Sequence, residues 1–223
     1  QVSEGGFSSR SSHPADREVY RHDIKVSFPF DTLLNTLLKY KIKNQEDIVM
    51  EGNMKVAVMN GIGKMGYTER PIPVPKDDEV LVKLEYVGIC GSDMHYYEMG
   101  RIGDYVVEPP FVLGHEPGGT VVEVGKNVTH LKVGDRVALE PGKTCGKCKF
   151  CREGKYNLCP DVVFFATPPV DGVFQEYVAH EAALCFKLPD NVSTLEGALI
   201  EPLAVGFHAA NQGGAHIGQK AVV

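Results

Sequence analysis

Four of the six cysteines in this 223-residue chain lie within fifteen positions, in the pattern Cys145-x2-Cys148-x2-Cys151-x7-Cys159. Spacings this short are difficult to close as local disulfides but suit thiolates that converge on a tetrahedral ion. Four thiolates complete the shell of Zn²⁺ and leave no position for a substrate. The pattern therefore predicts a structural zinc site that holds a loop of low apolar content, in a reducing compartment.

The overall charge limits the classes of partner. A net charge of −6 and a pI near 5.8 argue against binding to nucleic acid, which requires a basic face, and also against a zinc-ribbon DNA module. No apolar run approaches the roughly 20 residues that cross a bilayer, so we expect no membrane span. The chain begins at Gln1 without a signal segment, from which we expect a fragment of a cytoplasmic protein.

The residue composition and the pattern of apolar residues change at Met54. Residues 1–53 contain a Ser-rich stretch and a leucine stripe, at Leu33, Leu34, Leu37 and Leu38, that fits one short helix. We interpret 1–53 as a flexible N-terminal extension without chemistry, because a single stripe of about three turns is marginal alone.

From Met54 onward, apolar strand patterns alternate with Gly and Pro turns. Strands are predicted at 55–58, 80–87, 120–124 and 136–139. A capping box formed by Ser193 and Glu196 predicts a helix, which Pro202 should bend or break, and a further strand begins at 220–223. The expected fold is mainly β, a partly open barrel with few helices.

A second metal signal is dispersed along the chain. It consists of Cys90, the pair His115-Glu116, and Glu201. Each is weak alone, since a lone Cys is usually a small buried apolar residue. Together they offer one sulfur, one nitrogen and carboxylate oxygens, the mixed and incomplete set with which a catalytic zinc keeps one position open.

These residues carry a family resemblance. The segment Gly114-His115-Glu116-x2-Gly119-x5-Gly125-x2-Val128 matches the zinc signature of the medium-chain alcohol dehydrogenase superfamily. Within it, the segments 91–97, 164–169, 187–192 and 197–203 resemble the sorbitol (polyol) dehydrogenases. The resemblance covers Met54 to Val223 and does not touch 1–53.

The resemblance implies a GroES-like zinc catalytic domain at 54–218, with 219–223 as the first strand of an α/β Rossmann domain at which the chain is truncated. It implies two zinc ions, one catalytic and one structural, and reversible oxidation of a polyol such as sorbitol or xylitol to a ketose with NAD. The full-length parent is expected to be a homo-oligomer, and this chain alone to be inactive.

The resemblance also implies roles for single residues. Cys90, His115 and Glu116 would bind the catalytic zinc, with Glu201 on the zinc water or a substrate hydroxyl, although Glu201 could instead be the third ligand. Asp93 would orient His115 through the ring nitrogen that does not bind zinc. Ser92 and His95 would relay the proton, and Tyr96 would contact the substrate. Phe165 would lie either in the cleft or in the apolar core. His130, His180, His208, His216 and Cys185 match no motif position and are interpreted as structural or surface residues.

Two other functions are compatible with these residues. One is a zinc dehydrogenase of another secondary alcohol, of threonine or of a sugar acid. The other is a zinc-stabilised scaffold without catalysis, which would need the four clustered cysteines but would have no use for Cys90, Ser92, His95, His115 and Glu116 together. The polyol and the choice of NAD over NADP are not determined by these motifs.

Overall fold

The structure is a computed structural model that describes residues 40–44, 47–220 and 222. The predicted leucine helix and most of the predicted extension 1–53 lie outside these residues. Within that segment the backbone forms an antiparallel hairpin of β1 (Tyr40–Asn44) and β2 (Asp47–Met50), regular structure that we did not predict there. The described residues belong to one compact unit.

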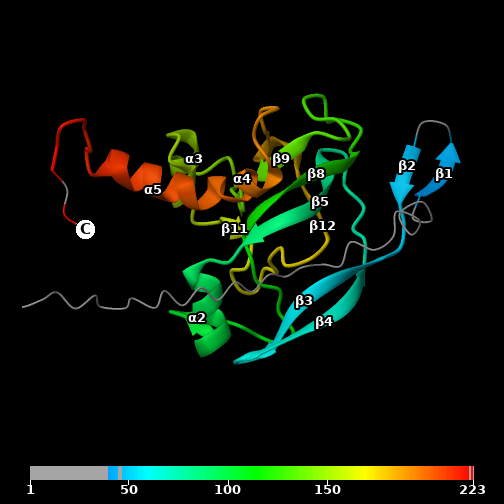
Figure 1. Cartoon of the computed structure of the whole chain (residues 1–223), viewed down its shortest axis with the longest axis horizontal. Coiled ribbons are helices and arrows are strands. Elements are labelled where there is room, and N and C mark those ends of the chain that lie inside the picture. The colour runs from blue at the N-terminus through cyan, green and yellow to red at the C-terminus, as the bar shows by residue number, and fades with distance from the viewer. Residues whose placement is uncertain (1–39, 45–46, 221, 223) are drawn as a thin grey trace, which may run out of the picture. The chain divides into compact units, whose positions relative to one another are not determined.

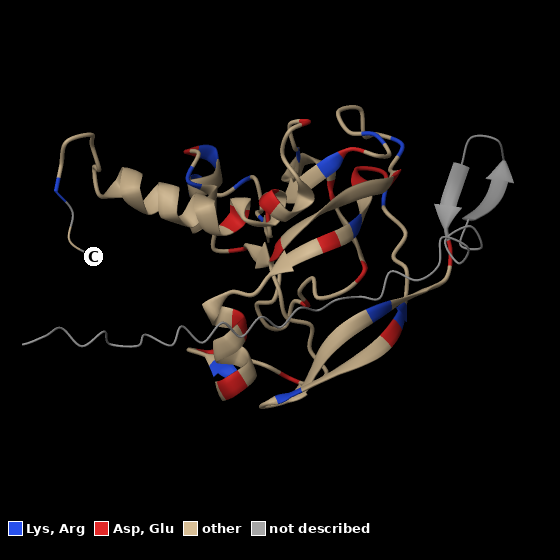
Figure 2. Cartoon of the chain, viewed as in Figure 1, with Lys and Arg blue, Asp and Glu red and all other residues tan. Residues whose placement is uncertain are grey.

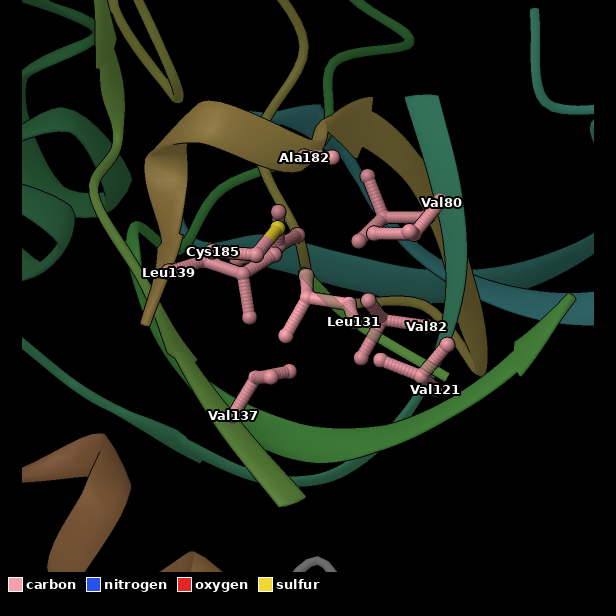
Figure 3. Close-up of a cluster of buried hydrophobic side chains, with 10 residues drawn as sticks. Val80, Val82, Val121, Leu131, Val137, Leu139, Ala182 and Cys185 are labelled. Carbon is pink, nitrogen blue, oxygen red and sulfur yellow. The ribbon is translucent and has the colours of Figure 1, made fainter. Parts of the chain in front are cut away.

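The central element is a five-stranded antiparallel sheet with the strand order β12-β5-β8-β9-β13 (Figure 1). Its strands are β5 (Glu79–Gly88), β8 (Glu116–Val124), β9 (Arg136–Leu139), β12 (Tyr177–Glu181) and β13 (Cys185–Lys187). The sheet curls around a cluster of buried aliphatic side chains, to which Val80, Val82, Val121 and Val137 contribute (Figure 3). The predicted mainly β, partly open barrel is confirmed.

A long hairpin of β3 (Asn53–Gly61) and β4 (Lys64–Pro71) covers the other side of β5. Leu81 of β5 is buried with Val56 and Val58 of β3, whereas its neighbours Val80 and Val82 are buried inside the curled sheet. β5 is therefore buried on both faces over this stretch, because alternate side chains of a strand point in opposite directions.

Helices are few. They are α2 (Gly91–Met99), α3 (Lys149–Arg152), α4 (Thr194–Ala198) and α5 (Ile200–Gln212). The predicted capping box is confirmed at the start of α4, where Ser193 Oγ accepts from the N–H of Glu196 and Glu196 accepts from the N–H of Ser193. The break lies at Leu199, before Pro202. Pro202 lies in the first turn of α5, where a missing N–H removes no helical hydrogen bond.

The remaining elements are short: β6 (Arg101–Ile102), β7 (Tyr105–Val106), β10 (Gly142–Lys143), β11 (Val163–Phe164) and the 3-10 turns Tyr156–Leu158 and Ala182–Leu184. The predicted strand at 220–223 is not formed at Lys220 or Val222, the two residues of that segment that the structure describes. None of the described helices is long and apolar enough to span a membrane. Lys and Arg are interspersed with Asp and Glu along the described elements (Figure 2).

Candidate metal centres

Three of the four dispersed candidates meet in the fold. The sulfur of Cys90, a ring nitrogen of His115 and a carboxylate oxygen of Glu116 lie within 4.8 Å of one another. Cys90 is the N-cap of α2, and Glu116 is the first residue of β8. The fold thus joins the start of a helix to the start of a strand, and His115 and Glu116 are both buried there.

Asp93 holds this group together. Its carboxylate is 2% exposed and accepts hydrogen bonds from the N–H of Cys90, at 3.0 Å, and from the N–H of Gly114, at 2.8 Å. The Oδ1 atom of Asp93 also faces Nδ1 of His115 at 3.7 Å. One buried carboxylate therefore fixes the backbone of Cys90 and the backbone next to His115, and it also faces the ring of His115, as expected for a residue that orients metal ligands without binding the metal.

The ionisation of His115 and Glu116 reflects this crowding. Burial favours the neutral imidazole, but the facing carboxylate of Asp93 and the sulfur of Cys90 outweigh it and raise the pKa of His115 to about 9. Burial raises the pKa of Glu116, and the charge of His115 opposes that rise. A side chain at Gly88, the residue opposite Glu116 on β5, would collide with the carboxylate of Glu116. Glycine at this position leaves room for the acid.

Glu201 lies beside the group but is not one of its three convergent side chains. It is the one charged residue of α5 and occupies the first turn, where a helix N-terminus favours a carboxylate (Figure 2). Burial raises the pKa of Glu201, the charge of His115 lowers it, and Glu116 and Asp93 raise it. Glu201 is thus near enough to interact electrostatically with all three.

The predicted relay residues lie along α2. Ser92 is half-buried in the first turn, and His95 is exposed one turn later. Tyr96 is 5% exposed, and its ring packs with Met59 and Phe111 in a buried cluster. Burial raises the pKa of the Tyr96 phenol, as do the nearby Tyr105 and Asp93. Most of Tyr96 serves the core, so its predicted substrate contact is limited to the small exposed part.

The aromatic neighbour of His115 is Phe164, with ring centroids 5.7 Å apart. The resemblance instead implied a role for Phe165, either in the cleft or in the apolar core. Phe165 packs against the central core and against His180, with ring centroids 4.8 Å apart, which favours its core interpretation over the cleft. Phe164 is the last residue of β11 and Phe165 begins the turn that follows, and the two adjacent rings have different neighbours.

The other unassigned residues have structural or surface positions. His130 and His180 contact the carbonyl oxygens of Ala182 and Glu140, at 3.0 and 2.8 Å, and burial lowers the pKa of His180. Burial raises the pKa of the Cys185 thiol to about 12. His208 and His216 are exposed. These positions agree with the interpretation from sequence.

The four clustered cysteines also converge, with their sulfur atoms within 4.8 Å of one another and all six cysteines of the chain free. The Sγ of Cys151 lies 3.5 Å from that of Cys148 and 4.0 Å from that of Cys145. A tetrahedral ZnS4 centre with Zn–S bonds of about 2.3 Å has edges of about 3.8 Å. The sulfur spacing fits this ion.

Backbone N–H groups point at these sulfurs. The N–H of Cys148 donates to Sγ of Cys145 at 3.3 Å, and the N–H of Cys145 donates to Sγ of Cys159 at 3.4 Å. Backbone donors from Lys147 and Cys148 lower the pKa of Cys145 to about 7. Hydrogen bonds of this kind stabilise thiolate, the form that binds metal. A closed sulfur site and an open mixed site are therefore both compatible with zinc, each by its donor set.

Comparison with known proteins gives one family. Residues 76–190 match the family described as Alcohol dehydrogenase GroES-like domain. This match contains the three convergent side chains, Asp93 and the four clustered cysteines.

Similar proteins are dehydrogenases. The sorbitol dehydrogenase of Bacillus subtilis is 57% identical over 158 residues, which are 71% of this chain and 45% of that protein. The crystal structure of an Escherichia coli oxidoreductase/dehydrogenase of unknown specificity superposes with a TM-score of 0.71 at 49% identity, over 76% of this chain and 49% of that one. The crystal structure of L-idonate 5-dehydrogenase from Escherichia coli gives 0.68 at 38% identity, over 73% and 47%. The chain spans about half the length of the curated relatives it matches.

Proposed function

Because this chain belongs to the alcohol dehydrogenase GroES-like domain family, within the zinc-dependent medium-chain alcohol dehydrogenase superfamily, we propose that it supplies the zinc- and substrate-binding part of an NAD-dependent polyol dehydrogenase. The observation that carries this function is the convergence of Cys90, His115 and Glu116 around the buried Asp93. A scaffold would require only the four clustered cysteines. We also propose that the zinc catalytic domain extends from residue 54 to residue 218, that the protein is cytoplasmic, and that it forms a homo-oligomer.

The residues divide the chemistry among them. Cys90, His115 and Glu116 would hold the catalytic zinc, and the four clustered cysteines, Cys145, Cys148, Cys151 and Cys159, would hold the structural one. Zinc in the mixed site supplies a Lewis acid that lowers the pKa of an alcohol. With zinc bound, His115 would lose its proton, and the negative charges of Cys90 and Glu116 would balance one dication.

Two residues of α2 would transfer the proton. The half-buried Ser92 hydroxyl would accept the alcohol proton, and the exposed His95 would pass it to solvent. Glu201 would accept a hydrogen bond from a second substrate hydroxyl, which is the contact that distinguishes a polyol from a simple alcohol. Tyr96 would add its exposed edge, and Phe164 would present an apolar wall beside His115.

The test is a titration that needs no nicotinamide. With Co²⁺ in the mixed site, the visible absorption of the metal reports a change at its open position. We expect sorbitol and xylitol to shift this spectrum saturably, and Glu201→Gln to weaken both responses at least several-fold while keeping the metal. A Cys90→Ser variant is the control that should lose the spectrum. A chain that binds no metal at the mixed site would contradict the proposed function.

A second candidate is a dehydrogenase of sugar acids, favoured by the likeness to L-idonate 5-dehydrogenase. The same titration decides between them. A response to L-idonate that exceeds the response to sorbitol would assign the sugar acid instead.

A further inference from the structure

A carboxylate outside the two metal centres links the sheet to the helix that precedes Glu201. Glu85 Oε1 accepts a hydrogen bond from the Thr120 hydroxyl of β8 at 2.6 Å, and Glu85 Oε2 accepts one from the Thr194 hydroxyl of α4 at 2.7 Å. Thr194 is 5% exposed and 109 residues distant from Glu85 in sequence. This hydrogen bond therefore connects the first residue of α4 to β5.

The backbone conformation of β5 at Glu85 directs its side chain toward this contact. On β5, Leu84 pairs with Gly119 and Tyr86 pairs with Gly118, so Glu85 is the extra residue of a β-bulge and has no partner opposite it on β8. Bulges redirect side chains and are frequent beside active sites. Here the residue at the bulge of β5 is Glu85, and its carboxylate accepts hydrogen bonds from side chains of β8 and α4.

α4 itself lies directly on β8. A Cβ at Gly118 would collide with the carbonyl oxygen of Thr194 and lie 2.8 Å from the backbone nitrogen of Ala198. Glu116, Gly118 and Thr120 occupy alternate positions of β8 and therefore share one face of the strand. The face that presents the candidate ligand Glu116 is also the face on which α4 rests.

Glu201 lies just after α4 in the sequence. α4 ends at Ala198, α5 begins at Ile200, and α5 also contacts β8 and β9. Any shift of α4 along β8 would therefore move Glu201 relative to Glu116. The Glu85–Thr194 hydrogen bond opposes such a shift at the far end of α4.

We propose that Glu85 is a positioning residue, which through Thr194 holds α4 in place on β8 and so sets the position of Glu201 beside the Cys90–His115–Glu116 group. This inference rests on the proposed function, because it assigns Glu201 a role at that metal site. This role requires a side chain at position 85 that is long enough to form a hydrogen bond with Thr194, and it does not require a negative charge.

The experiment measures zinc affinity of the mixed site in the 223-residue chain by competition with a chelator. Thr194→Val removes the hydroxyl at constant shape, and we expect a several-fold loss, up to about 10-fold, because lost outer-shell partners of a metal site cost affinity on this scale. Thr194→Ser should behave as the unmodified chain. Thr120→Val is the matched control: it removes a hydrogen bond to the same carboxylate without touching α4, and should leave affinity unchanged.

A second pair of variants tests reach against charge. Glu85→Gln can still accept from one threonine and donate to the hydroxyl oxygen of the other, so it should keep the affinity, whereas Glu85→Ala should lose as much as Thr194→Val. The double variant Thr194→Val with Glu201→Gln should bind zinc no more weakly than Glu201→Gln alone, since the two changes act through one group.

The outcomes separate the two proposals. Zinc bound at the mixed site with equal affinity in Thr194→Val and the unmodified chain would overturn the positioning role alone. Equal losses in Thr194→Val and Thr120→Val, or additive losses in the double variant, would also overturn it, because they indicate a general structural effect. No zinc at the mixed site of the unmodified chain would overturn the proposed function and this inference with it.

Discussion

The Nδ1 atom of His115 lies 3.7 Å from Oδ1 of Asp93, a carboxylate that is 2% exposed. The same carboxylate accepts the N–H groups of Cys90 and Gly114, so it has polar partners on two segments of the candidate site, the start of α2 and Gly114-His115. We expect Asp93→Asn to lower zinc affinity at the mixed site by about 10-fold to 100-fold, the usual cost of losing such a partner. Competition with a chelator measures the change.

The control is Asp135→Asn, which alters another buried aspartate that accepts a backbone N–H, pairs with a lysine and belongs to neither metal group. Its zinc affinity should equal that of the unmodified chain. Equal losses in the two variants would show that Asp93 acts only through general stability.

The four-cysteine site makes a prediction about stoichiometry. We expect two zinc ions per chain and one after Cys148→Ser, because three thiolates no longer close the shell of the structural ion. Metal analysis of the purified protein measures this directly. Cys185→Ala, which changes a buried thiol outside both clusters, should keep two. A single zinc that is insensitive to Cys148→Ser would contradict the structural site.

The two carboxylates near His115 should have separable roles. Glu116 converges with Cys90 and His115, whereas Glu201 interacts with them only as a neighbouring charge. Glu116→Ala should therefore remove zinc from the mixed site, whereas Glu201→Gln should retain zinc there with the several-fold weaker affinity expected when a negative charge beside the ion is lost. In a full-length enzyme Glu201→Gln should lower turnover by about 10-fold to 100-fold. Zinc analysis and steady-state kinetics report the two effects, and the reverse pattern would exchange the roles.

The parts of the fold that follow from local chemistry could be predicted from the sequence. Residues 136–139 form β9 at the predicted bounds, and the Ser193–Glu196 capping box marks the start of α4. The grouping of Cys90 with His115 and Glu116 followed from the family motif. Motif spacing identifies such ligands although no local pattern shows that they meet.

Register and long-range polar contacts could not be predicted. Strict alternation along the predicted strand 80–87 places Tyr86 on the same side as Val80 and Val82, yet Tyr86 is 46% exposed, because the bulge at Glu85 changes the alternation. The sequence left Phe165 between the cleft and the core, and nothing in it indicated that the neighbouring Phe164 packs against His115. The link between Glu85 and Thr194 has no sequence signal, because the partners are brought together only by the seating of α4 on β8.

Asp135 provides a pH-dependent stability test away from the metals. Its hydrogen bonds from the Lys187 ammonium, at 2.8 Å, and from the N–H of Lys132 lower the pKa of this carboxyl below its ordinary value of 3.8. A lowered folded-state pKa stabilises the fold above the ordinary pKa, and this contribution is lost as pH falls through the folded value. Asp135→Asn should therefore lower the free energy of unfolding by about 1 kcal/mol at pH 7.

Urea unfolding at pH 7, pH 5 and pH 3 checks the sign. The difference between Asp135→Asn and the unmodified chain should persist at pH 5 and shrink below about pH 4. A difference that does not change with pH would assign the effect of Asp135 to packing.

The last prediction is that the 223-residue polypeptide by itself neither oxidises sorbitol nor binds NADH with micromolar affinity. Dinucleotides bind where a Gly-rich turn joins a strand to a free helix N-terminus. The described turn of this kind leads from β5 into α2, but there the N–H of Cys90 is bonded to Asp93 and the first turn faces the candidate metal group. Gly213, Gly214 and Gly218 follow α5 and precede no described helix.

Hydride transfer needs nicotinamide held within roughly 3 to 3.5 Å of the alcohol carbon, and that positioning supplies much of the rate. Without such a site among the described residues, an alcohol could bind at the mixed centre but its hydride would have no acceptor. Calorimetric titration of the zinc-loaded chain with NADH, beside a sorbitol oxidation assay, measures both parts of the prediction. Saturable micromolar binding, or steady formation of NADH, would contradict it and would locate a nucleotide site within residues 1–223.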